Sequence, residues 1–240
     1  MNIIFLRMLV ITILFAPVNA TFGMSDVEKT ATAAFQGNNA ALNALIQEAD
    51  TGNAEAQMWL GTLYYAKKEF NKAFSLFEKS HFQGNLQATF NLARMYDRGL
   101  GIKKNLGKAK ELYLMSAKKR YADSQHNIGN MYFLGEGVKK DYKEALKWLL
   151  LAAEQGQRMA QRDLGLMFAD GHGVKRNYVL AYSYMSLAAI NNEPSADIVA
   201  AKIKNLMTQN EITTANRLIN QAKEIREQEI RNYLNKELNR

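Results

Sequence analysis

A motif of about 36 residues recurs along this chain and constrains its fold more than any other feature. Successive units are separated by 32, 36, 36 and 36 residues when they are aligned on Gly52, Gly84, Arg120, Gly156 and Asn192. Four positions later every unit has a small residue: Ala56, Ala88, Ser124, Ala160 and Ala196. A period of this length is typical of solenoids, in which one structural unit stacks on the next.

Each unit predicts a first helix, which we name helix A. Leucine or isoleucine lies four residues after the small position, and an aromatic residue lies four residues further on, at Leu60 and Tyr64, Leu92 and Tyr96, Ile128 and Tyr132, and Leu164 and Phe168. This spacing places all of these side chains on one face of an α-helix. Small residues on that face let a neighbouring helix approach closely.

A turn and a second helix, helix B, follow in three of the units. The turns share a Gly-x-Gly pattern at Gly99–Gly101, Gly135–Gly137 and Gly171–Gly173, and glycine tolerates the positive φ that ends a helix. Asn105, Asp141 and Asn177 then stand where a side chain caps the next helix. The unit that begins at Gly52 lacks this glycine turn, but its helix B pattern is intact.

The combined pattern, small-x3-Leu-Gly-x2-Tyr and then Gly-x-Gly-Val-x2-Asp/Asn-Tyr-x2-Ala-x2-Trp, resembles the Sel-one-like repeat (SLR), a relative of the tetratricopeptide repeat. The resemblance covers about residues 25 to 220. It implies an all-α fold, a right-handed α-solenoid of tandem antiparallel helix-turn-helix repeats with a concave surface. Members typically serve as scaffolds for protein partners, and exported bacterial members are often linked to the cell envelope or to host interaction.

The predicted organisation follows from the repeat. It comprises a signal peptide (1–20), a degenerate amino-terminal capping repeat (21–51), four repeats (52–83, 84–119, 120–155 and 156–191), and closing helices with a charged helical tail (192–240). The tail from about residue 216 is expected to be a solvated helix whose ends fray, although its loose apolar stripe also suits pairing with a partner helix.

The first twenty residues predict export. Arg7 precedes the apolar run 8–15, and Pro17 and the small-residue pattern ending at Ala20 follow it. This order is typical of a signal peptide cleaved after Ala20. A membrane anchor is the alternative, but the run is shorter than the roughly 20 residues that a spanning helix needs. With no cysteine in the chain, neither a lipidated cysteine nor a disulfide is expected, and the mature protein is predicted to be soluble and periplasmic or secreted.

The sequence offers few candidates for catalysis. Its three histidines, His81, His126 and His172, form no metal-binding spacing, and we expect all three to be structural or surface residues. Ser116 and Lys119 match a Ser-x2-Lys motif, but Ser116 occupies a packing position and the companion motifs are missing. We therefore expect no enzymatic activity, no cofactor and no metal. A modulator of a periplasmic cell-wall enzyme and a hydrolase of cell-wall material are the alternatives.

Two surfaces are candidates for binding a protein partner. The first is the helix A face two and six residues after the small position, which we expect to point away from the packed face and to be concave. Its residues are Met58, Thr62, Phe90, Arg94, His126, Asn130, Arg162 and Leu166. Aromatic, methionine and arginine side chains are enriched in interfaces. A variable, solvated face is the equally acceptable alternative.

The second candidate is a row of cations after the turns. Lys103, Lys104, Lys139, Lys140, Lys175 and Arg176 occupy equivalent repeat positions. Stacked repeats would align them along one edge, where they could attract an acidic protein or an anionic envelope polymer. A solvating rim is the alternative. The formal charge is +8, but no nucleic-acid recognition motif is present and export would separate the protein from nucleic acid, so that partner is not expected.

Overall fold

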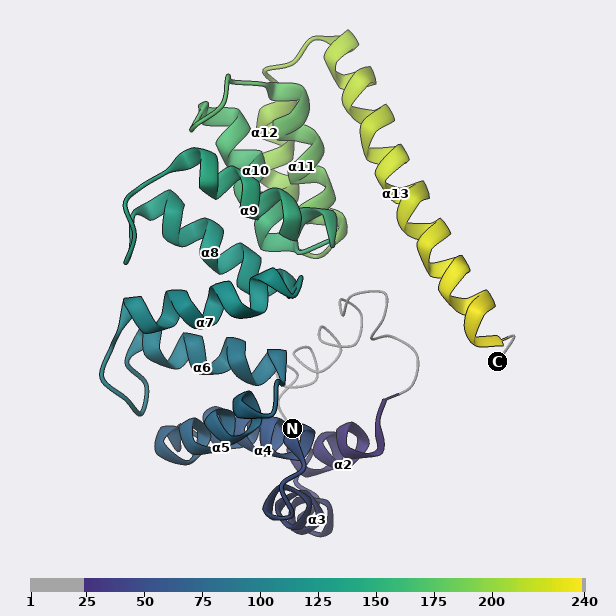
Figure 1. The fold of residues 1–240 in the computed structure, drawn as a ribbon. Coiled ribbons are helices and arrows are strands. Elements are labelled where there is room, and N and C mark those ends of the chain that lie inside the picture. Colours follow the sequence, from purple (N-terminus) through teal and green to yellow (C-terminus); the bar gives the residue numbers. More distant parts are fainter. Residues whose placement is uncertain (1–23, 239–240) are drawn as a thin grey trace. The chain divides into compact units, whose positions relative to one another are not determined.

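The computed structural model describes the backbone of residues 24–238 and the side chains as far as residue 225 (Figure 1). The predicted signal peptide lies outside the described residues. All regular elements in the described part are α-helices, which confirms the all-α class. They are α2 (Asp26–Phe35), α3 (Asn39–Asp50), α4 (Ala54–Ala66), α5 (Phe70–Phe82), α6 (Leu86–Arg98), α7 (Leu106–Lys118), α8 (Ala122–Leu134), α9 (Tyr142–Glu154), α10 (Arg158–Asp170), α11 (Tyr178–Ile190), α12 (Ala196–Lys204) and α13 (Gln209–Leu238).

The helices form two compact units, an amino-terminal unit (24–140) and a carboxy-terminal unit (141–238). Helix A corresponds to α4, α6, α8 and α10, and helix B to α5, α7, α9 and α11. In the amino-terminal unit, α4 packs on α5 and α6 on α7, and consecutive hairpins pack on each other. In the carboxy-terminal unit, α10 packs between α9 and α11, and α11 also contacts α12 and α13.

The predicted helix A face forms the core. The small-position residues Ala56, Ala88, Ser124 and Ala160 are all 0% exposed, and the Leu60, Leu92, Ile128 and Leu164 side chains are at most 4% exposed. The glycine that follows the leucine permits close packing of helix A against helix B, because a Cβ added at Gly61 would lie only 2.8 Å from the ring of Phe77. The pattern of small and large residues therefore sets how closely the two helices of a hairpin approach.

The predicted caps and turns are also present. Asn105, Asp141 and Asn177 each accept backbone N–H bonds at the start of their helix, and Gly99, Gly135 and Gly171 end helix A in the left-handed conformation. These contacts satisfy N–H and C=O groups that a helix terminus would otherwise leave unpaired.

The second glycine of two turns lies against the preceding hairpin of the same unit. A Cβ added at Gly101 would meet the carbonyl carbon of Phe70 at 2.7 Å, and one added at Gly173 would overlap the Cβ of Tyr142. Each of these turns therefore rests directly on the first residue of the preceding helix B. Only glycine leaves room for that contact.

The first position of each repeat has a positive φ even where it is not glycine. Its φ is 86° at Gly84 and 80° at Gly156, and it remains 66° at Arg120 and 59° at Asn192. A residue with a Cβ is strained in this conformation, and asparagine is strained less than arginine.

We therefore expect Arg120→Gly to stabilise the amino-terminal unit. Relief of the left-handed strain should exceed the extra entropy that glycine gives the unfolded chain, and the net gain should be about 0.5–1 kcal/mol. Urea denaturation of the two proteins measures it. Arg120→Ala is the control, because it removes the long side chain and keeps the strain; equal stabilisation by both variants would contradict this explanation.

The two ends of the repeat array have their own caps. The Ser25 hydroxyl accepts the Glu28 N–H at 3.0 Å and caps the start of α2, and α2 and α3 cover the apolar face of α4. At the other end, the Ser183 hydroxyl on α11 donates to the Ala215 carbonyl of α13 at 3.5 Å. The packed face of α13 includes Ile219, which is 6% exposed, whereas Ile225 is 63% exposed.

Candidate partner-binding surface

An arginine lies between aromatic rings on the helix A surface of the amino-terminal unit. The Arg94 guanidinium carbon is 5.5 Å from the centre of the Tyr65 ring and 5.6 Å from that of Phe90. Phe90 in turn lies 5.4 Å from the Tyr121 ring and 5.9 Å from the Tyr113 ring. We name Tyr65, Phe90, Arg94 and Tyr121 the arginine–aromatic cluster. All four side chains are half-buried, so each is partly accessible on the surface.

The phenol groups of Tyr113 and Tyr121 stay protonated. Burial, with Asp97 adding to it, raises the pKa of Tyr113, and burial together with Asp123 raises the pKa of Tyr121. The positive charge of Arg94 acts in the opposite direction on both, but is outweighed. The two phenols therefore remain neutral hydrogen-bonding groups throughout the physiological pH range.

The prediction that all eight helix A residues point away from the packed face is wrong for two of them. Met58 is only 2% exposed and His126 only 5%. In the case of Met58 the reason is that α4 contacts α2 and α3 as well as α5, so the helix is covered on more than its small-residue face. The Thr62 hydroxyl donates to the Met58 carbonyl of its own helix at 2.9 Å, and Asn130 Nδ2 lies 3.0 Å from His126 Nε2.

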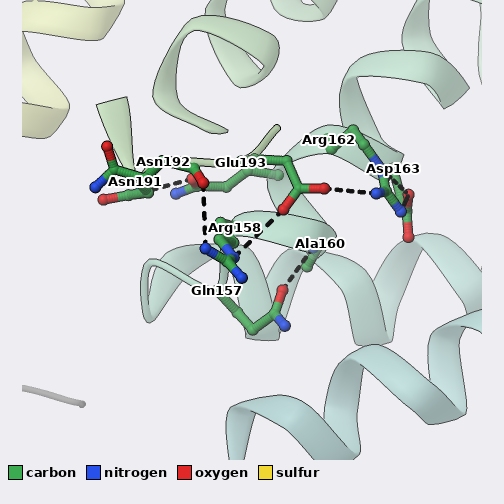
Figure 2. Close-up of polar contacts among 9 residues, drawn as sticks. Gln157, Arg158, Ala160, Arg162, Asp163, Asn191, Asn192 and Glu193 are labelled. Carbon is green, nitrogen blue, oxygen red and sulfur yellow. Dashed lines mark hydrogen bonds and ion pairs between the residues drawn. The ribbon is translucent and has the colours of Figure 1, made fainter. Parts of the chain in front are cut away.

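Leu166 and Arg162 lie on α10 in the carboxy-terminal unit. Leu166 is 41% exposed, as the prediction requires. Arg162 forms ion pairs within the unit: its Nη1 lies 2.5 Å from Glu193 Oε1, and its Nη2 lies 2.9 Å from Asp163 Oδ1 (Figure 2). The Glu193 side chain is only 5% exposed. Binding by these helix A residues stays a prediction, and of the eight, Phe90 and Arg94 are the pair that the structure brings into contact within the partly exposed cluster.

The Glu193 network joins the loop after α11 to helix A of the same repeat. Arg158 Nε lies 3.4 Å from Glu193 Oε2, and Arg158 Nη1 donates to the Asn192 carbonyl at 3.1 Å (Figure 2). The buried carboxylate thus faces two guanidinium groups, one turn apart on α10. This arrangement fixes the end of the last hairpin and makes Arg162 a structural residue.

Sequence reasoning missed a row of buried glutamines directly after the small position. Each donates its side-chain N–H to a carbonyl near the end of the preceding helix, which is α3, α7 or α9: Gln57 to Ala49 at 3.1 Å, Gln125 to Ala117 at 3.1 Å and Gln161 to Ala153 at 3.2 Å. Gln57 and Gln161 also accept a bond from the residue that ends the helix B of their own hairpin, Gln83 or Asn191, both at 2.8 Å. The recurrence of glutamine at this position was the signal that could have revealed these links between repeats.

One repeat replaces this glutamine link with a different pair. Thr89 stands where the others have glutamine, and His81 stands where they have alanine. His81 Nδ1 lies 2.9 Å from the Thr89 hydroxyl oxygen, so a histidine from helix B reaches the next helix A. Burial lowers the pKa of His81, Lys108 lowers it further, and Glu78 opposes both.

The stability of the amino-terminal unit should therefore decrease as pH falls from about 7.5 to 5. The pKa of His81 is lower in the folded chain than the roughly 6.5 expected in the unfolded chain. As pH falls, the unfolded state therefore binds the proton before the folded state does, and the free energy of unfolding decreases. The double variant His81→Ala/Thr89→Gln recreates the glutamine link and should reduce this pH dependence. Urea midpoints measured across that pH range test it, and an identical dependence in both proteins would contradict it.

The other residues considered for chemistry have structural contacts. Ser116 is fully buried, donates within α7 and lies 2.6 Å from the Ser124 hydroxyl, as expected for a packing position. His172 stacks on Tyr142, with ring centres 5.4 Å apart. Among the described residues, no group of three or more His, Asp or Glu side chains is placed to hold a metal ion. No helix in that part of the chain is long and apolar enough to cross a membrane.

The predicted cations after the turns are all on the surface. Lys103, Lys104, Lys139 and Lys140 are exposed in the amino-terminal unit, as are Lys175 and Arg176 in the carboxy-terminal unit. A further lysine-rich segment, residues 67–72, comprises the short connection 67–69, which takes the place of the missing glycine turn, and the first residues of α5. The repeat pattern does not predict this segment because its length differs from that of the other turns.

Comparison with known proteins identifies the repeat. The model of the Sel1 repeat matches residues 54–80, 86–121, 122–157 and 158–192. The chain is similar to a Sel1 repeat protein from Oxalobacter formigenes, with a TM-score of 0.70 and 27% identity over 80% of this chain and 84% of the other. It is also similar to a protective antigen of uropathogenic Escherichia coli that displays an SLR fold, with a TM-score of 0.73 and 29% identity over 86% of this chain and 47% of the antigen.

Two curated relatives match over shorter segments. One is an ERAD-associated E3 ubiquitin-protein ligase component, HRD3, of Candida glabrata, 36% identical over 54 residues, which are 22% of this chain and 6% of the relative. The other is the DAP3-binding cell death enhancer 1 of Rattus norvegicus, 38% identical over 69 residues, which are 28% of this chain and 14% of the relative. The matched segments therefore span a small part of both relatives.

Proposed function

The chain belongs to the Sel1-repeat family, and on that premise we propose that it is an exported, non-catalytic scaffold that binds a partner protein through helix A of its amino-terminal unit. Sel1-repeat proteins are generally scaffolds for protein interaction. The names of both curated relatives describe association with other proteins, as a component of a ligase and as a binding protein. Export is supported by the signal-peptide pattern of residues 1–20.

The arginine–aromatic cluster is the observation that carries the proposal. Arginine and large aromatic residues dominate the binding energy of protein interfaces, and they do so where rings and guanidinium groups are already held in place. In this cluster Tyr65 and Phe90 fix the guanidinium of Arg94 from two helices. A partner would therefore meet a surface whose side chains lose little rotational freedom on binding.

Site-specific photocrosslinking tests the location of the interface. A benzophenone amino acid at Phe90 should give a defined protein adduct in the producing cells, whereas the same group at Met115, which is 51% exposed on helix B, should not. Arg94→Ala should reduce the Phe90 adduct about tenfold or more, since truncating a central arginine costs on the order of 2 kcal/mol. Equal adducts from both positions would contradict a helix A interface.

The export proposal has a separate test. Fractionation of the producing cells should place the chain in the periplasm or medium, and mass spectrometry should give a mature amino terminus at Thr21. An intact chain in the cytoplasm would refute export and leave the helix A interface untouched.

A further inference from the structure

We propose that the amino-terminal unit has a second binding surface, an edge formed by its helix A–helix B turns, and that this edge binds an acidic polypeptide segment with an apolar side chain. This goes beyond the helix A interface, because different residues carry it. We name the surface the basic edge and define it by the lysines in three turns and at the start of α5: Lys67, Lys68, Lys72, Lys103, Lys104, Lys139 and Lys140.

The turns are brought together by direct contact between repeats. Gly101 of the α6–α7 turn lies against Phe70 at the start of α5, and Gly137 of the α8–α9 turn lies against Leu106 at the start of α7, where an added Cβ would be 2.8 Å from Leu106 Cβ. Each turn therefore lies on the preceding hairpin, and Figure 1 shows the α6–α7 turn extending beyond the ends of its helices. The lysine-rich segments follow one another along one edge of the unit.

The two glycine turns also share one conformation. A Cβ added at Gly99 would lie 3.2 Å from Lys104 Cβ, and one added at Gly135 would lie 3.2 Å from Lys140 Cβ. The same backbone shape presents the lysine pairs 103–104 and 139–140 in the same way in both repeats. The pairs are thus equivalent, stacked elements of one surface.

Charge is strongly unbalanced along this edge. Residues 67–72, 99–105 and 135–141 contain seven lysines, two glutamates and one aspartate, Asp141. One of the glutamates, Glu69, pairs with Lys72 at 2.6 Å, and the other, Glu136, is exposed. All seven lysines are exposed, so the edge presents a positive potential that favours an acidic ligand.

One aromatic side chain at the edge favours a polypeptide over a simple polyanion. An open depression of about 450 Å³ lies where the α4–α5 and α6–α7 turns meet, and Phe70 is the apolar side chain among its mostly polar lining residues, which are Lys68, Glu69, Phe70, Asn71, Lys72 and Gly101. The Phe70 ring is held edge-on to Tyr65 with ring centres 5.5 Å apart. An acidic segment with one leucine can place that side chain against Phe70 while its carboxylates face the lysines, whereas a polyphosphate or a nucleic acid backbone offers charge alone.

Fluorescence anisotropy with the full-length mature chain tests the proposal. The probe is a labelled twelve-residue peptide of glutamate and glycine with one central leucine, long enough to extend over about 40 Å. The edge variant is Lys68→Glu/Lys103→Glu/Lys104→Glu. The control is Lys79→Glu/Lys118→Glu/Lys119→Glu, which makes the same charge change at exposed residues near the other ends of α5 and α7.

The edge variant should raise the Kd of the peptide about tenfold or more, because three attractions become repulsions, whereas the control variant should change it about twofold at most. Binding should weaken as salt rises from 50 to 300 mM, and replacing the leucine with glycine should weaken it further. Equal loss in the two variants would show attraction to the net charge alone and would overturn the proposal. Polyphosphate competing equally well, with no effect of the leucine, would assign the edge to an anionic polymer instead.

Discussion

Replacing Gly101 with alanine is expected to lower the free energy of unfolding of the amino-terminal unit by about 3 kcal/mol, from left-handed strain and overpacking together. Gly101 has a φ of 70°, which strains a residue with a Cβ. The new methyl group would also lie 2.7 Å from the Phe70 carbonyl carbon and 2.8 Å from its oxygen. Because these are backbone atoms, the turn must move away from α5, and the close contact between Gly101 and Phe70 would be lost.

Gly84→Ala is the matched control for this prediction. Gly84 has a φ of 86°, but an added Cβ there meets no atom within 4 Å. It should therefore cost only the conformational part, about 1 kcal/mol. Urea denaturation gives both values, and hydrogen exchange of residues 99–105 should rise in the Gly101 variant alone. Equal losses in the two variants would show that the contact with Phe70 contributes little.

The helices, their caps and their closest contacts could be predicted because each depends on a short stretch of sequence. A cap needs one side chain and a nearby backbone N–H, as at Asn105, and a left-handed helix end needs one glycine, as at Gly135. Because each local signal recurs in several repeats, a chance match in one repeat can be recognised by comparison with the others. The same argument located the buried small positions without any knowledge of the packing partners.

The binding surface was harder to predict because exposure depends on which helices lie alongside. Met58 and Arg94 are both on helix A at positions expected to face outwards, yet the first is buried and the second lies on an accessible cluster. Helical periodicity gives the direction of a side chain but not the neighbour that it meets. The amino-terminal capping helix α2 covers part of α4, and no repeat position encodes that.

Contacts outside the repeat pattern could not be predicted either. Tyr65 lies near the end of α4, where the other repeats have Asp97, Phe133 and Ala169, and its contact with Arg94 joins helix A of one repeat to helix A of the next. The network of Glu193 depends on a carboxylate at a repeat position where the earlier repeats have Asn53, Asn85, Tyr121 and Gln157. Both sites depend on a residue that the other repeats do not share at that position, so a comparison between repeats does not reveal them.

The Glu193 network leads to a second large effect. Glu193→Gln should destabilise the carboxy-terminal unit by about 2 kcal/mol, because the buried carboxylate would no longer neutralise the two guanidinium groups and these would still lie close together. The Glu193 side chain is 5% exposed, and the partners Arg158 and Arg162 are 28% and 37% exposed, so solvent compensates part of the loss. This compensation sets the expected value below that of a fully buried ion pair.

The same substitution at an exposed ion pair of the same unit is the control. Glu144 lies 3.4 Å from Lys147, with side chains 39% and 61% exposed, and Glu144→Gln should cost less than about 0.5 kcal/mol. A double-mutant cycle of Glu193→Gln with Arg162→Met should then give a coupling energy of about 1–2 kcal/mol, measured by urea denaturation. A coupling near zero would mean that Arg158 alone holds the carboxylate and that Arg162 is available to a partner, as the helix A pattern predicts.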